Sequence, residues 1–352
     1  MTSSLRIAVV SDARSIHTMR WVEWLEGRGH EVALFSLVKG AGASYFGPEP
    51  PLDRRYLFTL GSAVRRTTSL LRKMLDDFDP QVVHGFYLVN HGHYAVGASR
   101  HPTVVTALGS DVLLAPNESW LLSRIVKKTA LGAARVIAPP VLVGELQKWG
   151  IEEKRLLSLI MGVKSELFKP SRKELMVLFS RGFSEVYDPI NLARAIPKVI
   201  NEVPDVRFIL AGNGPLREKV AQMLEDTGPS VTFPGFLPED ELAILMGRAR
   251  VVVTPALSDS IPLTALEAMA SGAVLVASDI EANRQWASAG TPVLLFPPGD
   301  TDALAKALIR ALTEERLSQL ALEHGPPLIS ENWHWDKAAL TVEALYHELC
   351  FR

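Results

Sequence analysis

The sequence has almost no cysteine and no apolar segment long enough to cross a membrane. Its single cysteine, Cys350, lies two residues from the C-terminus, which excludes an internal disulfide framework and a cysteine-based metal site. No apolar run reaches the roughly 18 residues that a membrane span needs, and the first residues form a short apolar strand rather than a signal-peptide core. We therefore expect a soluble cytoplasmic protein, with peripheral contact at the inner face of a membrane as the alternative.

The chain also lacks a large net charge, but its two halves differ. It has 37 basic and 39 acidic side chains and a net charge of -2, which argues against a nucleic-acid partner. Up to residue 165 there are 20 Lys and Arg against 14 Asp and Glu, which leaves 17 against 25 in the remainder. A basic first half suits an anionic partner, and two solvated surfaces of uneven charge explain the difference equally well.

Short apolar strands alternate with amphipathic helical segments, which is the pattern of βαβ units and parallel sheets. With 352 residues, of which 47% are hydrophobic, the chain can form two cores. The predicted strands are residues 5–11, 31–37, 81–86, 103–108, 135–139, 156–160, 175–180, 206–212, 231–235, 251–255, 273–278 and 292–296. Residues 39–55 are rich in Gly and Pro, and we predict a mobile loop there.

A polar stretch that contains proline follows the sixth strand and marks a domain boundary. We predict doubly wound domains at residues 1–168 and 169–330 and a C-terminal helical segment at 331–352 that packs back on the first domain. Ligands of such sheets bind at the carboxyl ends of the strands, so two domains placed face to face would share one cleft. Dehydrogenases and periplasmic binding proteins show the same pattern, so motifs must distinguish these classes.

Residues 250–277, RVVVTPALSDSIPLTALEAMASGAVLVA, combine a strand, a turn, a helix that ends at Gly272 and a second strand. The turn brings backbone N–H groups and a helix N-terminus to one point, which favours binding of a diphosphate. Glu267 lies one turn into the helix, where it can accept hydrogen bonds from a ribose, and Asp259 can receive hydroxyls of a second sugar. The alternative is a generic strand-turn-helix with Glu267 as a solvated carboxylate.

This stretch resembles the signature of the large retaining glycosyltransferase family 4, in which two Glu separated by seven residues precede a segment like AMASG. The first acid here is Asp259, one methylene shorter. Residues 207–220 and 231–255 resemble the family's Gly-x-Gly-Pro turn and its base-contacting strand, loop and helix. The resemblance implies an α/β fold of the GT-B type, with two Rossmann-like doubly wound domains facing an interdomain cleft. The first domain would bind an acceptor and the second a nucleotide-sugar donor.

The same resemblance implies a donor site built from three segments. Arg181 matches the cation that neutralises the departing diphosphate, while Asp259 would hold the donor sugar and Glu267 the ribose. The other donor-binding residues implied are Gly212, Asn213, Gly214, Phe236, Leu237, Ser260, Ile261, Pro262, Leu263 and Thr264. The glycines among them let the backbone approach the donor, and the Phe-Leu pair borders the nucleotide base.

The chain departs from the family pattern at several positions. Tyr187 or Asp188 lies where a second cation is usual, and Leu108 lies where many relatives have a His beside the reacting sugar. The glycine-containing loop usual after the first strand is replaced by SDARSIHTMRW. Ser15 and His17 are therefore candidates for acceptor contact through their side chains, and His17 can equally cap its own helix.

Four further polar side chains need an interpretation. Asp111 is a candidate catalytic carboxylate on the acceptor side, with a structural role as the alternative, and His84 is a candidate substitute for the missing His. His91 and His93 are further possible substitutes, although we favour a place on a helix surface for both. Their spacing offers no nearby third metal ligand. We predict no metal site and no cofactor.

The reaction implied is metal-independent transfer of a sugar, with retention of configuration, from a nucleotide sugar to a glycan, a lipid-linked sugar or a small molecule. The departing phosphate would take the acceptor proton, so no strong side-chain base is required. A lipid-linked acceptor at an anionic membrane would suit the basic first half. A nucleotide-sugar-binding protein without turnover and a nucleotide-sugar epimerase are the alternatives.

Overall fold

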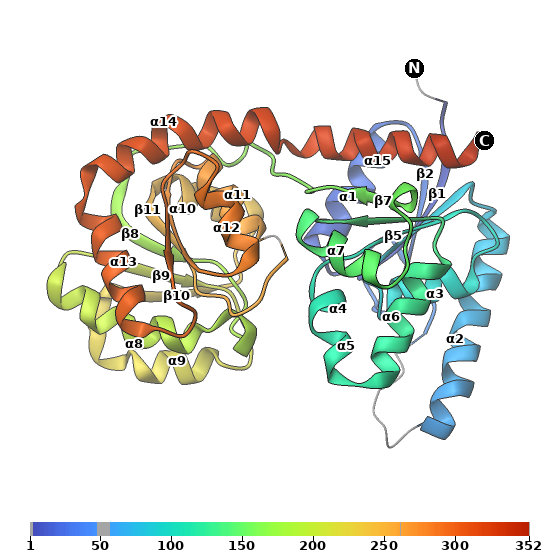
Figure 1. The fold of residues 1–352 in the computed structure, drawn as a ribbon, viewed down its shortest axis with the longest axis horizontal. Helices are drawn as coiled ribbons and strands as arrows, with labels where there is room; N and C mark the ends of the chain where they lie inside the picture. The colour runs from blue at the N-terminus through green and yellow to red at the C-terminus, as the bar shows by residue number, and fades with distance from the viewer. Residues whose placement is uncertain (1–2, 48–56, 261, 352) are drawn as a thin grey trace. The chain divides into compact units, whose positions relative to one another are not determined.

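The computed structural model describes residues 3–47, 57–260 and 262–351. The chain divides into two compact units (Figure 1): unit 1 comprises the residues up to Ile160 and those from Ala339 on, and unit 2 runs from Met161 to Ala338. The division falls before the predicted boundary at 168/169, because Val163 already pairs with His334 in a parallel bridge within unit 2.

Unit 1 is built on a seven-stranded sheet in the order β3-β2-β1-β4-β5-β6-β7, with every pair parallel. Its strands are β1 (Arg6–Val10), β2 (Glu31–Ser36), β3 (Ala43–Tyr45), β4 (Val82–Phe86), β5 (Thr103–Thr106), β6 (Arg135–Ala138) and β7 (Leu156–Ser158). Its helices are α1 (Ile16–Gly27), α2 (Leu57–Phe78), α3 (His91–Ala98), α4 (Ser110–Leu113), α5 (Ala115–Glu118), α6 (Trp120–Gly132), α7 (Pro140–Lys148) and the short η2 (Glu153–Arg155). The strand order reverses beside β1, which lies between β2 and β4.

Buried strand residues explain why helices cover this sheet. Ile7, Ala8, Val9 and Val10 of β1 are all inaccessible to solvent, as expected for a central parallel strand that packs on both faces. One core cluster joins β1, β2 and β4 to α2 and α3, and another joins β5 and β6 to α6 and α7.

The segment predicted as a loop at 39–55 contains an additional strand. The backbone of β3 pairs with that of β2, with Leu34 opposite Ala43, and Phe46 just beyond it is fully buried. The prediction was wrong for residues 43–45, because an edge strand of three residues needs only backbone hydrogen bonds on one side. Residues 48–55 of the predicted loop lie outside the described part of the chain.

Unit 2 has a six-stranded parallel sheet in the order β10-β9-β8-β11-β12-β13. Its strands are β8 (Glu174–Phe179), β9 (Arg207–Ala211), β10 (Val231–Gly235), β11 (Ala249–Thr254), β12 (Val274–Ser278) and β13 (Val293–Phe296). Its helices are η3 (Glu185–Tyr187), α8 (Pro189–Glu202), α9 (Arg217–Met223), η4 (Glu225–Ser230), α10 (Glu239–Arg248), α11 (Leu263–Ala270), α12 (Glu281–Ala287), α13 (Thr301–Thr313) and α14 (Glu315–Asn332). All twelve predicted strands form, which confirms the α/β class with parallel sheets.

Gly272 ends α11 as predicted. Its φ of +65° lies in the left-handed region, where glycine carries no Cβ penalty. Gly272 N–H donates to the Met269 carbonyl and Ala273 N–H to the Ala268 carbonyl. A Cβ here would also lie 2.8 Å from Leu322 of α14, so the position favours glycine for two independent reasons.

The last helix, α15 (Trp335–Cys350), forms where it was predicted, and its residues from Ala339 on pack within unit 1. Tyr346 is fully buried, and its hydroxyl accepts a hydrogen bond from Trp21 Nε1 at 3.3 Å. None of the helices in the described ranges combines the length and the apolar character that crossing a bilayer requires.

The ends of two helices in unit 2 meet at one half-buried lysine. Lys173 Nζ donates to the carbonyls of Gly247, in the last turn of α10, at 2.8 Å, and of Ser271, after α11, at 2.6 Å. We expect Lys173→Met to lower the free energy of unfolding by about 2 kcal/mol, because these carbonyls lose their hydrogen-bond donor. Urea denaturation measures this, with Lys198→Met, which removes an exposed ion pair, as the control. If both substitutions lowered the free energy of unfolding equally, Lys173 would not have the stabilising role that these contacts indicate.

Candidate functional site

The donor-side candidates of unit 2 lie where β8, β9 and β11 end. The strand order reverses beside β8, which lies between β9 and β11, and ligands of doubly wound sheets bind outside the carboxyl ends of the strands at such a point. Arg181 follows β8, Gly212 follows β9 and Asp259 follows β11. The structure therefore brings three segments together that the sequence analysis had assigned separately.

Arg181 lies between a carboxylate and an aromatic ring. Its Nη2 donates to Asp259 Oδ2 at 2.5 Å, and the two side chains are only 14% and 11% exposed. Its guanidinium carbon lies 4.2 Å from the centroid of the Tyr187 ring, within the range of a cation–π contact. Burial raises the pKa of Asp259, and the Arg181 charge and a hydrogen bond from Ser260 N–H offset part of that rise.

Two glycines allow the loops around Arg181 to pack closely. Gly212 has a φ of +125°, and a Cβ there would lie 2.4 Å from the Arg181 carbonyl oxygen. Gly214 has a φ of +156°, and its Cβ would meet the Phe183 carbonyl at 2.6 Å. These glycines are needed for contact between protein loops, in addition to the predicted approach to a donor. Asn213, between them, is exposed.

The turn before α11 has few solvent-accessible side chains. Ser260 is 4% and Thr264 5% exposed. Pro262 is buried at the N-cap position of α11, and Leu263 is the first residue of the helix. Ile261 lies outside the described residues. Glu267 is 9% exposed, so it is not the solvated carboxylate that the alternative interpretation required.

The residues expected to border a nucleotide base follow β10. Phe236 is 70% exposed and Leu237 is half-buried. Gly212 N–H donates to the Gly235 carbonyl at 2.7 Å, which brings this loop beside the glycine-containing turn. An exposed phenylalanine at the end of a strand is a ready surface for stacking.

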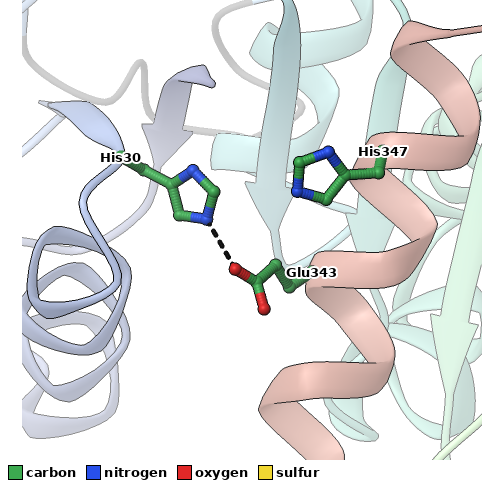
Figure 2. A group of neighbouring side chains, drawn as sticks. All are labelled: His30, Glu343 and His347. Atoms are coloured by element: carbon green, nitrogen blue, oxygen red, sulfur yellow. Dashed lines mark hydrogen bonds and ion pairs between the residues drawn. The ribbon is translucent and has the colours of Figure 1, made fainter. Parts of the chain in front are cut away.

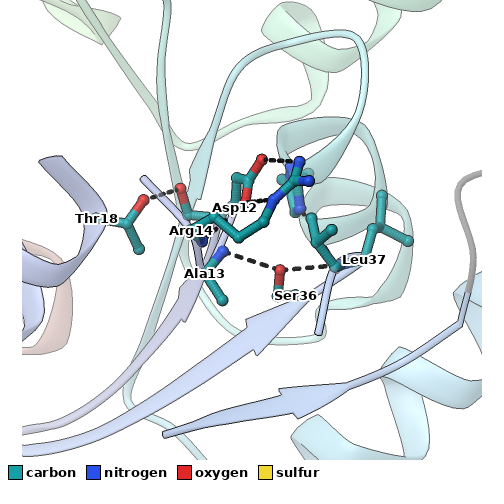
Figure 3. Close-up of polar contacts among 9 residues, drawn as sticks. Asp12, Ala13, Arg14, Thr18, Ser36 and Leu37 are labelled. Atoms are coloured by element: carbon teal, nitrogen blue, oxygen red, sulfur yellow. Dashed lines mark hydrogen bonds and ion pairs between the residues drawn. The ribbon is translucent and has the colours of Figure 1, made fainter. Parts of the chain in front are cut away.

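A pocket of about 320 Å³ opens in unit 1 at the carboxyl ends of β1, β2, β4 and β5. Its lining includes Ser11, Asp12, Arg14, Ser15 and Leu108, with Leu108 half exposed. Figure 3 shows how the loop after β1 is held: Arg14 donates to Asp12, and Ala13 N–H donates to the Ser36 hydroxyl at 3.1 Å. His17 is exposed on α1 and is not part of this lining.

His91 contributes to the pocket, contrary to its predicted place on a helix surface. It is 7% exposed, and its Nε2 accepts from Leu37 N–H at 3.3 Å, so the ring proton belongs on Nδ1. Burial lowers the pKa of His91 to about 4, against the opposing charge of Asp12, so the ring is neutral at pH 7. His93 of the same helix is half-buried, with its Nδ1 3.1 Å from Thr129 Oγ1.

The sequence analysis also missed Tyr87 as a pocket residue. Its φ of +69° lies in the left-handed region, a strained conformation that is common at functional sites. Its hydroxyl lies 3.0 Å from Ser110 Oγ, and Asn90 lines the pocket nearby. No pattern in the sequence signals a positive φ at a tyrosine.

His84 and Asp111 are buried and form hydrogen bonds within unit 1. His84 is 1% exposed, with its ring bonded to Tyr346 and to Thr106, and burial lowers its pKa to about 3. Asp111 is fully buried and accepts backbone N–H groups, including Leu88 at 2.9 Å and Gly109 at 2.8 Å. These buried positions do not fit the catalytic role predicted for His84 and Asp111. Asp111 fits the structural role given as its alternative, because its carboxylate organises the loop before α4.

One cluster in the described residues has the composition of a metal site: His30, Glu343 and His347 (Figure 2). The hydrogen bonds argue against that use. Leu5 N–H donates to His30 Nδ1 at 3.1 Å, so the proton is on Nε2, which faces Glu343 Oε1 at 2.9 Å. A metal at Nε2 would move the proton to Nδ1, against the Leu5 donor. Arg28 also donates twice to the Glu343 carboxylate.

Comparison with known families gives matches to both halves of the chain. Residues 6–139 match the family described as Glycosyl transferase 4-like, and residues 175–314 match Glycosyl transferases group 1. The sulfoquinovosyl transferase SQD2 of Arabidopsis thaliana is 23% identical over 92% of this chain and 68% of its own length. A phosphatidyl-myo-inositol mannosyltransferase of Mycolicibacterium smegmatis is 32% identical over 36% of this chain and 33% of its own length.

Solved structures share the fold over nearly the full length. Sucrose-phosphate synthase from Thermosynechococcus elongatus superposes with a TM-score of 0.80 at 20% identity, covering 98% of this chain and 99% of the other. The Anabaena protein HepE, solved in complex with UDP-glucose, gives 0.80 at 16% identity, covering 98% and 100%. The predicted GT-B fold is confirmed.

Proposed function

This chain belongs to the group 1 family of glycosyltransferases, and from that premise we propose that it transfers a sugar from a nucleotide-sugar donor to a hydroxyl-bearing acceptor with retention of configuration. The observation that carries the proposal is the buried Arg181 after β8, facing the turn that precedes α11. The named activities of the relatives, which include sulfoquinovosyl and mannosyl transfer, support a hexose-type donor.

The donor would bind to unit 2. Its diphosphate would lie between Arg181 and the backbone amides before α11, whose N-terminus favours negative charge. Asp259 would accept hydroxyls of the transferred sugar and Glu267 those of the ribose, with the base beside Phe236. These groups would stabilise the charge on the leaving diphosphate without a divalent metal or another cofactor.

The acceptor would bind in the pocket of unit 1. Its hydroxyl oxygen would form the new bond to the anomeric carbon as the bond to the phosphate oxygen breaks, and the departing phosphate would take the hydroxyl proton. No side-chain base is required in this scheme, which suits a pocket that has Leu108 at its edge and a neutral His91. A glycan, a lipid-linked sugar or a small polyol would meet this chemistry.

We also propose peripheral contact with an anionic membrane as the setting for a lipid-linked acceptor. The exposed basic side chains of unit 1 include Arg65, Arg66 and Lys73 of α2 and Lys127 and Lys128 of α6. Both helices pack against α3, so they lie on the same side of the unit. Each such charge near an anionic surface contributes about 1 kcal/mol to binding.

A thermal-shift screen tests the donor assignment. We expect one nucleotide among UDP, GDP and ADP, and its sugar conjugates, to raise the melting temperature of the purified chain, because ligands that bind only the folded state stabilise it. Glu267→Ala should remove most of that shift, whereas the exposed Asp302→Asn should keep it. Absence of a shift with every nucleotide would contradict the proposed function. Binding without transfer would favour a non-catalytic role, and conversion of the sugar without acceptor an epimerase.

A further inference from the structure

The contacts of Arg181 have a consequence for which ligands the donor site accepts. Its Nη2 is bound to Asp259 at 2.5 Å, and its Nε is buried without a hydrogen-bond partner among the described residues. A diphosphate that takes the guanidinium must therefore compete with a carboxylate that already neutralises it. The competition is strong because both side chains are largely withdrawn from solvent.

The separation of the two charged groups is set by the backbone. Leu257 N–H donates to the Val186 carbonyl at 2.8 Å, which joins the loop of Asp259 to the loop of Tyr187. On the other side, the close approach of Gly212 holds the Arg181 backbone. The ion pair therefore belongs to a defined arrangement of three loops rather than to two mobile side chains.

Removal of Arg181 from this pair leaves Asp259 in an unfavourable state. One of its oxygens keeps the Ser260 N–H at 2.8 Å. The other loses its ion pair with Arg181 while it remains largely buried, and an uncompensated buried charge is costly. A free nucleoside diphosphate has no sugar hydroxyls to donate hydrogen bonds to Asp259 in place of Arg181. A nucleotide sugar brings hydroxyl donors to the same place, so the carboxylate exchanges one partner for another.

We propose that Asp259 competes with the ligand's diphosphate for Arg181, so that the site favours a nucleotide sugar over the free nucleoside diphosphate, and that Tyr187 is the positioning residue that keeps the guanidinium in place while its partner changes. The inference rests on the proposed function and deepens it. Asp259 then has a second role beyond holding the sugar. Once the sugar has been transferred, Asp259 loses its hydroxyl partners, the ion pair with Arg181 forms again, and the diphosphate product leaves.

Tyr187 suits the positioning role because its contact does not use the hydrogen-bonding edge of Arg181. The ring stacks at 4.2 Å on the guanidinium, packs against the core of unit 2, and lies 3.5 Å from where a Cβ of Gly182 would be. A cation–π contact in a partly desolvated site persists whether the N–H groups face a carboxylate or a phosphate.

Titration calorimetry of the full chain with UDP, GDP and ADP in turn tests the competition. For the nucleotide that the wild-type protein binds, Asp259→Asn should bind the diphosphate about tenfold more tightly, because its Arg181 is no longer neutralised. In the same variant kcat/KM for the matching nucleotide sugar should fall. Asp302→Asn, which removes a carboxylate from an exposed ion pair with Lys198, should change neither quantity.

The outcomes separate the inference from the proposed function. If the wild-type protein binds and transfers but Asp259→Asn binds the diphosphate no more tightly, the inference alone is overturned. If the wild-type protein binds no nucleotide at all, both fail. Should Asp259→Asn not fold, the wild-type protein still decides: equal affinity for the diphosphate and its sugar conjugate contradicts the competition, and a tenfold preference for the conjugate supports it.

A pair of substitutions tests Tyr187. Tyr187→Phe keeps the ring and should retain kcat within about twofold, whereas Tyr187→Leu should lower kcat about tenfold with little change in KM. A purely structural role would lower stability without this split between kcat and KM. Equal kcat values for the phenylalanine and leucine variants would overturn the positioning role.

Discussion

Replacing Arg181 by alanine is expected to lower kcat/KM about 10³-fold for the donor that the wild-type protein uses. The guanidinium is the one cationic side chain that the described structure places at the ends of β8 and β11, and removal of a preorganised group that stabilises developing charge costs this much in other active sites. Steady-state kinetics at saturating acceptor measure the effect. Arg181→Lys should be intermediate, since it keeps the charge but loses the planar fork.

The same substitution should change how stability depends on pH. Burial already raises the pKa of Asp259, and Arg181 opposes that rise, so its removal raises the pKa further. An acid with a raised pKa in the folded state binds more protons than the unfolded chain, and stability falls as pH rises from about 4 through the folded-state pKa. Adding Asp259→Asn to Arg181→Ala should remove this dependence. For the kinetic prediction, a kcat/KM of Arg181→Ala within tenfold of the wild-type value would contradict the role of Arg181.

The strands could be predicted from the sequence because central parallel strands are continuous apolar runs. Val251, Val252 and Val253 are fully buried, and a short run of β-branched apolar residues is typical of such a strand. β3 escaped detection because its residues Ala43–Tyr45 are half-buried or exposed. Its pairing depends on backbone geometry that follows a glycine-containing turn, which residue types alone do not specify.

The proposed donor site combines a local motif, which the sequence shows directly, with contacts between distant segments, which it does not. Asp259 and Glu267 belong to one continuous motif, but the Arg181–Asp259 ion pair joins residues 78 positions apart. Tyr187 was interpreted as the absence of a cation, although its ring contacts the cation that is present. The residue type determines which interactions a side chain can form, and only the fold determines which groups it contacts.

The pocket of unit 1 was still less predictable from the sequence. Its lining comes from the ends of four strands, so no continuous motif contains it. His84 was chosen because it lies near the end of a strand, yet it is buried. His91, for which a helix surface was favoured over a role as substitute, lines the pocket. Whether a histidine at the end of a strand points into the core or toward a ligand depends on packing across the sheet.

Glu343→Leu is expected to lower the free energy of unfolding by about 3 kcal/mol. The Glu343 carboxylate accepts from Arg28 at 3.0 Å and from His30 Nε2 at 2.9 Å, and its side chain is 3% exposed. Leucine would leave the His30 N–H buried without an acceptor, because the tautomer is fixed by the Leu5 donor at Nδ1. Urea denaturation at pH 7 measures the loss, and Asp79→Asn, which breaks an exposed pair with Arg6, should cost under about 1 kcal/mol.

The pH dependence of that loss separates the carboxylate's charge from its packing. Against the effect of burial, hydrogen bonds from Arg28 and His30 and the charge of Arg28 hold the pKa of Glu343 below its ordinary value of 4.5. Its contribution is therefore complete above about pH 4.5 and disappears as pH falls through the lower folded-state pKa. The difference between wild type and Glu343→Leu should shrink on acidification below pH 4.5. A difference that stays constant down to pH 3 would mean that side-chain packing, and not the ion pair, fixes α15 in unit 1.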